Sequence, residues 1–125
     1  MVEIRDLRSA ILSEQKNIGV IINMRLRSYN EDLQKRLLNV DEAAEYLTAC
    51  FEDSEEVFLL GLRQVVEAHG GIGTLAEETK LNRESLYRML SESGNPKLSS
   101  LAIVLATLGL RLHFSPLDDE EKEAA

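Results

Sequence analysis

The segment from Gly71 to Leu90, GIGTLAEETKLNRESLYRML, constrains the fold more than any other part of the chain. Its apolar residues have the spacing of two short helices joined by a sharp turn. Leu75 and Leu86 are predicted to face inward, with the small Ala76 where the two helices cross. Leu81 lies in the predicted turn, where its side chain fills the space between the helices.

The two helices of this unit are expected over residues 72–79 and 83–91, and further apolar stripes predict helices on both sides of it. These helices are expected to start near Met1, Asn30, Asp41, Asp53 or Ser54, and Lys97 or Ser99. Their inward residues are predicted to be Ile4, Leu7, Ile11, Leu33, Leu37, Leu38, Ala44, Leu47, Phe51, Phe58, Leu62, Val65, Val66, Leu98, Leu101, Val104, Leu105 and Leu108. The chain is therefore predicted to be all-α, a bundle of about five to six helices.

A short strand is predicted over residues 110–115, where Leu110, Leu112 and Phe114 alternate with polar residues. Residues 20–29 alternate in a similar way. A single strand is not stable alone, so the C-terminal strand needs a partner. That partner is the stretch near 20–28, the same strand of a second molecule, or another protein. The second alternative predicts a homodimer.

Composition excludes several classes of protein. A chain of 125 residues is long enough for one core, and no run approaches the length of a membrane span. The single cysteine, Cys50, cannot form an internal disulfide and is expected to be a buried structural thiol in a cytoplasmic protein.

No enzyme, cofactor or metal site is predicted. His69 and His113 have no Cys, Asp or Glu at ligand spacing. The glycines between Gly70 and Gly73 lack the preceding strand and the lysine of a phosphate loop, so they are expected to end a helix. The acidic pairs at 41–42, 52–53 and 55–56 stand at predicted helix starts, where carboxylates are favourable in any case.

The net charge of −8 is unevenly distributed. Residues 71–117 carry five basic and four acidic groups. By contrast, residues 24–70 carry five basic and ten acidic groups, and residues 118–125 carry one basic and five acidic groups. The two predicted helices and their turn form a helix-turn-helix. This unit thus lies in the one part of the chain where basic groups outnumber acidic groups. A helix-turn-helix presents its second helix to the major groove of double-stranded DNA, which favours positive charge.

The second helix has polar residues on its outer face. Asn82 can cap it, Arg83 can donate two hydrogen bonds to guanine, and Arg88 can reach a base or a phosphate. The predicted DNA-binding residues are Asn82, Arg83, Glu84, Ser85, Tyr87 and Arg88, with Lys80, Asn95 and Lys97 as flanking phosphate contacts. Glu84 is expected to orient Arg83 or Arg88, while Tyr87 either stacks on the DNA backbone or completes the core. The alternative is a polar surface without a ligand.

Five motifs in order resemble the helix-turn-helix addiction-module antidote proteins, the antitoxins of bacterial toxin–antitoxin operons. They are YNEDLQKRL, DEAAEYLTACFED, FLLGLRQVVEAHGG, LAEETKLNRESLYRMLSESGNP and LATLGLRL, between about Met24 and Leu117. The resemblance implies a λ-repressor-like domain that dimerises, represses its own operon and binds a small basic toxin. Lys80 replaces the glycine that is common in the turn of such proteins.

The predicted organisation is an N-terminal extension (1–23), a helical domain (24–117, motif 71–91) and a disordered acidic tail (118–125). The extension is either an effect of start-codon choice or a real segment that packs on a partner. We expect a chain that begins at Met24 to fold and bind DNA.

The predicted function is that of a DNA-binding antitoxin. The helices between Asn30 and Glu56, with two basic and nine acidic groups, are expected to hold the toxin, although the C-terminal strand or tail is an alternative. The rival functions are a stand-alone transcription regulator and a protein-binding module in which the helix-turn-helix is only structural.

Overall fold

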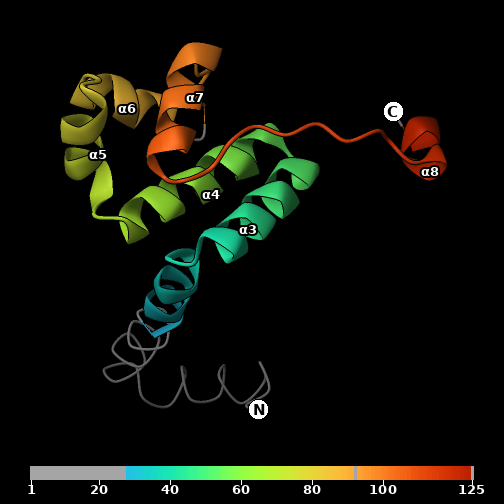
Figure 1. Cartoon of the computed structure of the whole chain (residues 1–125), viewed down its shortest axis with the longest axis horizontal. Coiled ribbons are helices and arrows are strands. Elements are labelled where there is room, and N and C mark those ends of the chain that lie inside the picture. The colour runs from blue at the N-terminus through green and yellow to red at the C-terminus, as the bar shows by residue number, and fades with distance from the viewer. Residues whose placement is uncertain (1–27, 92, 125) are drawn as a thin grey trace, which may run out of the picture.

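A computed structural model describes residues 28–91 and 93–124 of the chain. These residues form a helical segment at 28–37 and six further helices: α3 (Val40–Asp53), α4 (Glu55–Ala68), α5 (Gly71–Thr79), α6 (Arg83–Met89), α7 (Leu98–Thr107) and α8 (Asp119–Ala124). Figure 1 shows α3 and α4 as a long antiparallel pair, with α5, α6 and α7 gathered at one end of it. The prediction of a helical bundle is confirmed for the described residues.

Most of the residues at the N-terminus lie outside this description. The helix predicted from Met1 falls on residues 1–27, which are not described, and so does nearly all of the strand predicted over 20–29. Residues 28 and 29 are helical, so the helix predicted from Asn30 begins earlier than expected. None of the described helices is both long and apolar enough to cross a membrane.

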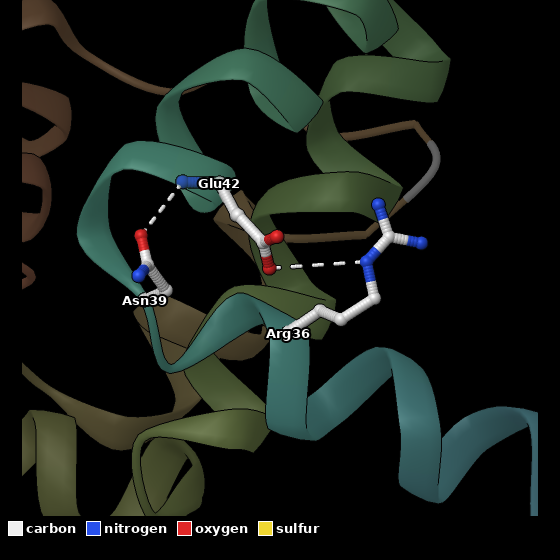
Figure 2. Close-up of polar contacts among 3 residues, drawn as sticks. All are labelled: Arg36, Asn39 and Glu42. Atoms are coloured by element: carbon white, nitrogen blue, oxygen red, sulfur yellow. Dashed lines mark hydrogen bonds and ion pairs between the residues drawn. The ribbon is translucent and has the colours of Figure 1, made fainter.

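The N-cap of helix α3 is Asn39, two residues before Asp41, its predicted cap. The Asn39 side chain instead accepts a hydrogen bond of 3.1 Å from the backbone N–H of Glu42, as Figure 2 shows. Glu42 also lies 3.8 Å from the Arg36 guanidinium, but both side chains are exposed, so this ion pair contributes little stability. Asp41 and Glu42 occupy the first turn, where their charge favours the helix dipole.

Helix α4 starts and ends at the predicted positions. Ser54 caps it by accepting a hydrogen bond of 3.1 Å from the backbone N–H of Val57. Gly70, with φ at 109°, ends it in the left-handed region that glycine adopts without strain. His69 Nε2 lies 3.3 Å from the carbonyl oxygen of Leu37, which connects the end of α4 to the end of segment 28–37.

The core extends through all helices from segment 28–37 to α7, and its buried members are Leu37, Ala43, Leu47, Leu62, Val65, Val66, Ile72, Leu75, Leu86, Met89, Leu90, Val104, Leu105 and Leu108. Most of the predicted stripes are part of it. The predicted stripe of α3 was wrong by one position: Ala43, Leu47 and Cys50 are buried, whereas Ala44 and Phe51 are exposed.

The α3 stripe is fixed by the crossing with α4. A Cβ at Gly61 would lie 2.8 Å from Cys50 Sγ, so Cys50 faces the closest approach of the two helices and is buried as predicted. Leu38 and Leu98, also predicted to face inward, are 53% and 70% exposed, because each lies at the end of its helix.

The strand predicted over residues 110–115 is not formed. Residues 110–118, here called the C-terminal arm, belong to neither a helix nor a strand and are almost entirely exposed. Figure 1 shows the arm leaving the end of α7, passing across the α3–α4 pair and reaching α8 well outside the helical body. No strand exists among the described residues, so the arm has no strand to pair with in that part of the chain.

The acidic tail contains the short helix α8 where disorder was predicted. Its first turn holds Asp119, Glu120 and Glu121, and Asp118 accepts a hydrogen bond of 2.7 Å from the Glu121 backbone N–H. Every side chain from residue 118 to 123 is exposed, so the tail is solvated even where it is helical.

Candidate nucleic-acid interface

The turn between α5 and α6 is formed by Lys80, Leu81 and Asn82. Lys80 ends α5 in the left-handed conformation, with φ at 63° and ψ at 16°, and its N–H donates to the Ala76 carbonyl at 3.0 Å. Thr79 Oγ1 fixes the turn from inside, because it donates to the Leu75 carbonyl at 2.7 Å and accepts from the Leu81 N–H at 3.2 Å. The chain thus passes from α5 to α6 within three residues.

Helix α6 has only seven residues and is held at both ends. At its start, Asn82 Oδ1 accepts a hydrogen bond of 3.1 Å from the Ser85 N–H. On its inner face, Leu86 is 1% exposed, and Leu90 is fully buried directly after the helix. With that face fixed, the rest of the helix surface is turned to solvent.

The outer surface of α6 borders an open groove of about 840 Å³. Six of the nine predicted DNA-binding residues line this groove: Lys80, Asn82, Ser85, Arg88, Asn95 and Lys97. Among the described residues, those lining it include three cations and no carboxylate. Its chemistry therefore suits a polyanion, with amide and hydroxyl groups between the positive charges.

The far wall of the groove is the connection between α6 and α7. Ser91 Oγ donates to the Arg88 carbonyl at 2.7 Å, and the Gly94 N–H donates to the Ser91 carbonyl at 2.9 Å. A Cβ at Gly94 would lie 2.8 Å from the Arg88 carbonyl oxygen, so only glycine allows this close return. Because the chain folds back against the end of α6 at Gly94, Asn95 and Lys97 line the groove on the side opposite α6.

The other three predicted residues lie outside the groove. The Arg83 guanidinium lies against α5, where a Cβ at Gly73 would be 2.5 Å from its Nη2 atom. Glu84 is exposed, and the described structure has no ion pair between it and either Arg83 or Arg88. No contact among the described residues therefore supports the orienting role predicted for Glu84. Tyr87 is 46% exposed and is therefore not part of the core.

A family model described as "Probable addiction module antidote protein" matches residues 27–116. The chain belongs to this antidote family. An uncharacterized protein of Haemophilus influenzae is 30% identical over 81 residues, which are 64% of this chain and 82% of that protein. No solved structure matches.

The structure of this antidote also adds residues that the sequence did not single out. Arg63 of α4 lies with its Cζ atom 5.8 Å from the centroid of the Tyr87 ring, a cation–π distance. Its position beside α6 could not be predicted from local spacing, since the two residues belong to different helices. Ser93 and Ser100 also line the groove. The available signal was the sequence Gly94-Asn95-Pro96 between them, a composition typical of a turn.

Among the described residues two titratable groups have a shifted pKa, and both lie away from the groove. Burial raises the pKa of Tyr46, with a further contribution from Cys50. Burial likewise raises the pKa of the Cys50 thiol, which disfavours the reactive thiolate. Among the described residues no group of His, Cys, Asp and Glu side chains is arranged to hold a metal ion.

Proposed function

We propose that this antidote is a DNA-binding antitoxin that represses its own operon as a homodimer and neutralises a small basic toxin by binding it. The observation that carries the DNA role is the groove beside α6, where Lys80, Arg88 and Lys97 lie together and no carboxylate is found among the described residues that line it. The order of α4, α5, α6 and α7 around one core also supports the λ-repressor-like arrangement. On this proposal the protein works in the cytoplasm and is not an enzyme.

In the proposed complex α6 enters the major groove of the operator. Arg88 and Ser85 face base edges, and Asn82 lies at the N-terminal end of the helix, which a recognition helix directs toward DNA. Lys80, Asn95 and Lys97 contact phosphates on the two sides. Arg83 reaches a base only after its side chain leaves Gly73, whereas Tyr87 and Glu84 lie beside the DNA backbone.

A salt titration of binding to the protein's own upstream DNA tests this role. We expect the affinity to fall steeply with salt, because each neutralised phosphate contributes about 0.9 to the slope of log K against log[salt]. Arg88→Ala should weaken binding at least about tenfold, since it removes a base or phosphate contact. Arg36→Ala is the matched control, because Arg36 is an exposed arginine outside the groove. Equal, salt-independent binding by all three proteins would contradict the proposal.

The toxin-binding role is proposed for the acidic helices. Between residues 30 and 56 the chain carries two basic and nine acidic groups, and the acidic first turns of α3 and α4 are exposed. Such a surface complements a basic protein and speeds its association. Co-purification with the product of the neighbouring gene, followed by a shift assay on the shared promoter, tests this role.

Two other functions make different predictions. A stand-alone transcription regulator would bind DNA in the same way but would have no basic partner encoded beside it. A protein-binding module would bind its partner without the steep salt dependence that phosphate contacts produce.

A further inference from the structure

The C-terminal arm carries apolar side chains that nothing among the described residues covers. Leu112 is 46% exposed and Phe114 is 88% exposed. In a fully extended chain both would lie on the same side as Leu110, because side chains alternate along a strand. Leu110 is anchored at the end of α7, because its N–H donates to the Leu105 carbonyl at 2.7 Å. The arm is thus held at one end, and within the described part of the chain its two large apolar side chains are exposed and its backbone pairs with no strand.

The pattern of the arm is complementary to itself. If two arms run antiparallel with Leu112 opposite Leu112 of the second copy, Leu110 of each arm lies opposite Phe114 of the other. The three pairs then form one continuous apolar face, with Arg111 and His113 on the other face. Pro116, which lacks the N–H that a ladder requires, lies beyond the last pair and ends the ribbon.

Charge favours a second copy of this chain at the arm. The protein has a net charge of −8, so most surfaces of two copies repel each other. Residues 110–117 of the arm include one arginine, one histidine and no carboxylate, and Asp118 ends the arm beyond the proposed pairs. The arm is therefore a place where two copies meet without this repulsion.

Helix α7, which leads into the arm, is also suited to a covered position. Its ten residues include no charged side chain, and a helix that is apolar on all sides is normally buried on all sides. One face, with Val104 and Leu105, is in the core, but Ala102, Ile103 and Ala106 on the other face are exposed. This uncharged face gives the apolar side of a two-stranded ribbon a surface to pack on, which a ribbon needs to be stable.

We propose that two copies of the protein associate through their C-terminal arms, which pair as an antiparallel ribbon centred on Leu112. This inference rests on the homodimer of the proposed function and specifies how that dimer is formed. Two arms paired in this way relate the copies by a two-fold axis, which is the symmetry that two operator half-sites require.

The first test is sedimentation of the full-length protein without DNA. The unmodified protein should be a dimer at micromolar concentration, and Leu112→Asp should weaken the dimer about 100-fold or more, because it places two carboxylates opposite each other in an apolar face. The matched control is Leu60→Asp on α4, since Leu60 is 42% exposed and Leu112 is 46% exposed. That variant should remain dimeric. A monomeric wild type, or an unchanged dimer in Leu112→Asp, would overturn the inference.

The second test fixes the register. In a Cys50→Ala background, Leu112→Cys should cross-link to a covalent dimer on mild oxidation, because opposite Cβ atoms in a ribbon are about 4.5–5.5 Å apart. His113→Cys should cross-link at least about tenfold more slowly, since the two copies of this residue lie diagonally. Equal rates would overturn the register.

The outcomes also separate this inference from the proposed function. A wild type that is monomeric alone yet binds operator DNA overturns the ribbon and leaves the DNA role intact. A wild type that dimerises as proposed but binds no operator DNA overturns the DNA role and leaves the ribbon intact. If the wild type is monomeric and Leu112→Asp instead abolishes binding of the co-expressed basic partner, the arm is a toxin-binding segment and the inference is wrong.

Discussion

Lys80 occupies a conformation that glycine adopts at lower cost. It is the non-glycine residue with positive φ among those described, and it lies on the rim of the cationic groove. A left-handed residue with a Cβ costs about 1 kcal/mol relative to glycine. Keeping lysine there is reasonable if its charge contributes to binding, since strained positions are often retained at functional sites.

Replacing Lys80 should therefore separate stability from DNA affinity. Lys80→Gly is expected to raise the free energy of unfolding by about 0.5–1 kcal/mol, measured by urea denaturation. The same variant should weaken operator binding and lower the salt slope by about 0.9, because one phosphate contact is lost. Lys80→Arg is the control that keeps the charge and the strain. An unchanged operator affinity in Lys80→Gly would exclude Lys80 from the interface.

Cys50 and Gly61 determine how closely α3 and α4 approach. A methyl group at Gly61 would lie 2.8 Å from Cys50 Sγ and 3.4 Å from the Tyr46 ring. Gly61→Ala should therefore lower the free energy of unfolding by about 1–3 kcal/mol, as overpacking does. Cys50→Ala removes the nearest atom and should restore part of this loss in the double variant, measured by thermal or urea unfolding. Additive losses would show that the thiol is not the obstacle.

At the scale of single elements, α6 depends strongly on its cap because it has only seven residues. Asn82→Ala removes the acceptor for the Ser85 N–H and should cost about 1 kcal/mol of stability. Asn82→Asp keeps the acceptor and should retain stability, but its charge lies in the groove and should repel phosphate. Urea denaturation and a DNA-binding titration of both variants check this. Tight operator binding by Asn82→Asp would place the end of α6 away from the DNA.

The helix-turn-helix could be predicted from sequence because local rules decide most of it. The spacing of Leu75, Leu81 and Leu86 determines the inward face, and the Asn82 side chain determines the start of α6. The predicted end of α6 was two residues too late, since the chain leaves the helix at the buried Leu90. Helix ends depend on hydrogen bonds within one turn, so errors of this size are expected there.

Features that depend on contacts between elements were not predictable in the same way. The predicted apolar stripe of α3 was displaced by one position because Ala44 and Phe51 have the same spacing as Ala43 and Cys50. Only the crossing with α4 determines which of these two pairs is buried. The strand at 110–115 has a correct alternation but no partner in the described chain. The position of Arg83 against Gly73 depends on a rotamer, which spacing does not specify.

For the whole molecule, the distribution of charge predicts two separable activities. The acidic first turns of α3 and α4 belong to the helical hairpin, whereas Lys80, Arg88 and Lys97 gather beside α6 at the end of that hairpin. Surface charges separated by more than a Debye length of about 8 Å are largely screened at physiological salt, so each group acts mainly on its own partner.

Charge variants of the two regions should therefore have opposite effects. Replacing Glu45, Glu52 and Glu56 by glutamine is expected to slow association with the basic partner by about tenfold and to leave operator affinity unchanged, because these exposed residues lie outside the groove. Arg88→Ala should weaken operator binding and leave partner association unchanged. Stopped-flow association and a shift assay on the same preparations measure the two activities. If both variants impaired both activities equally, the partner and the operator would share one surface, and the acidic helices would not be the neutralising site.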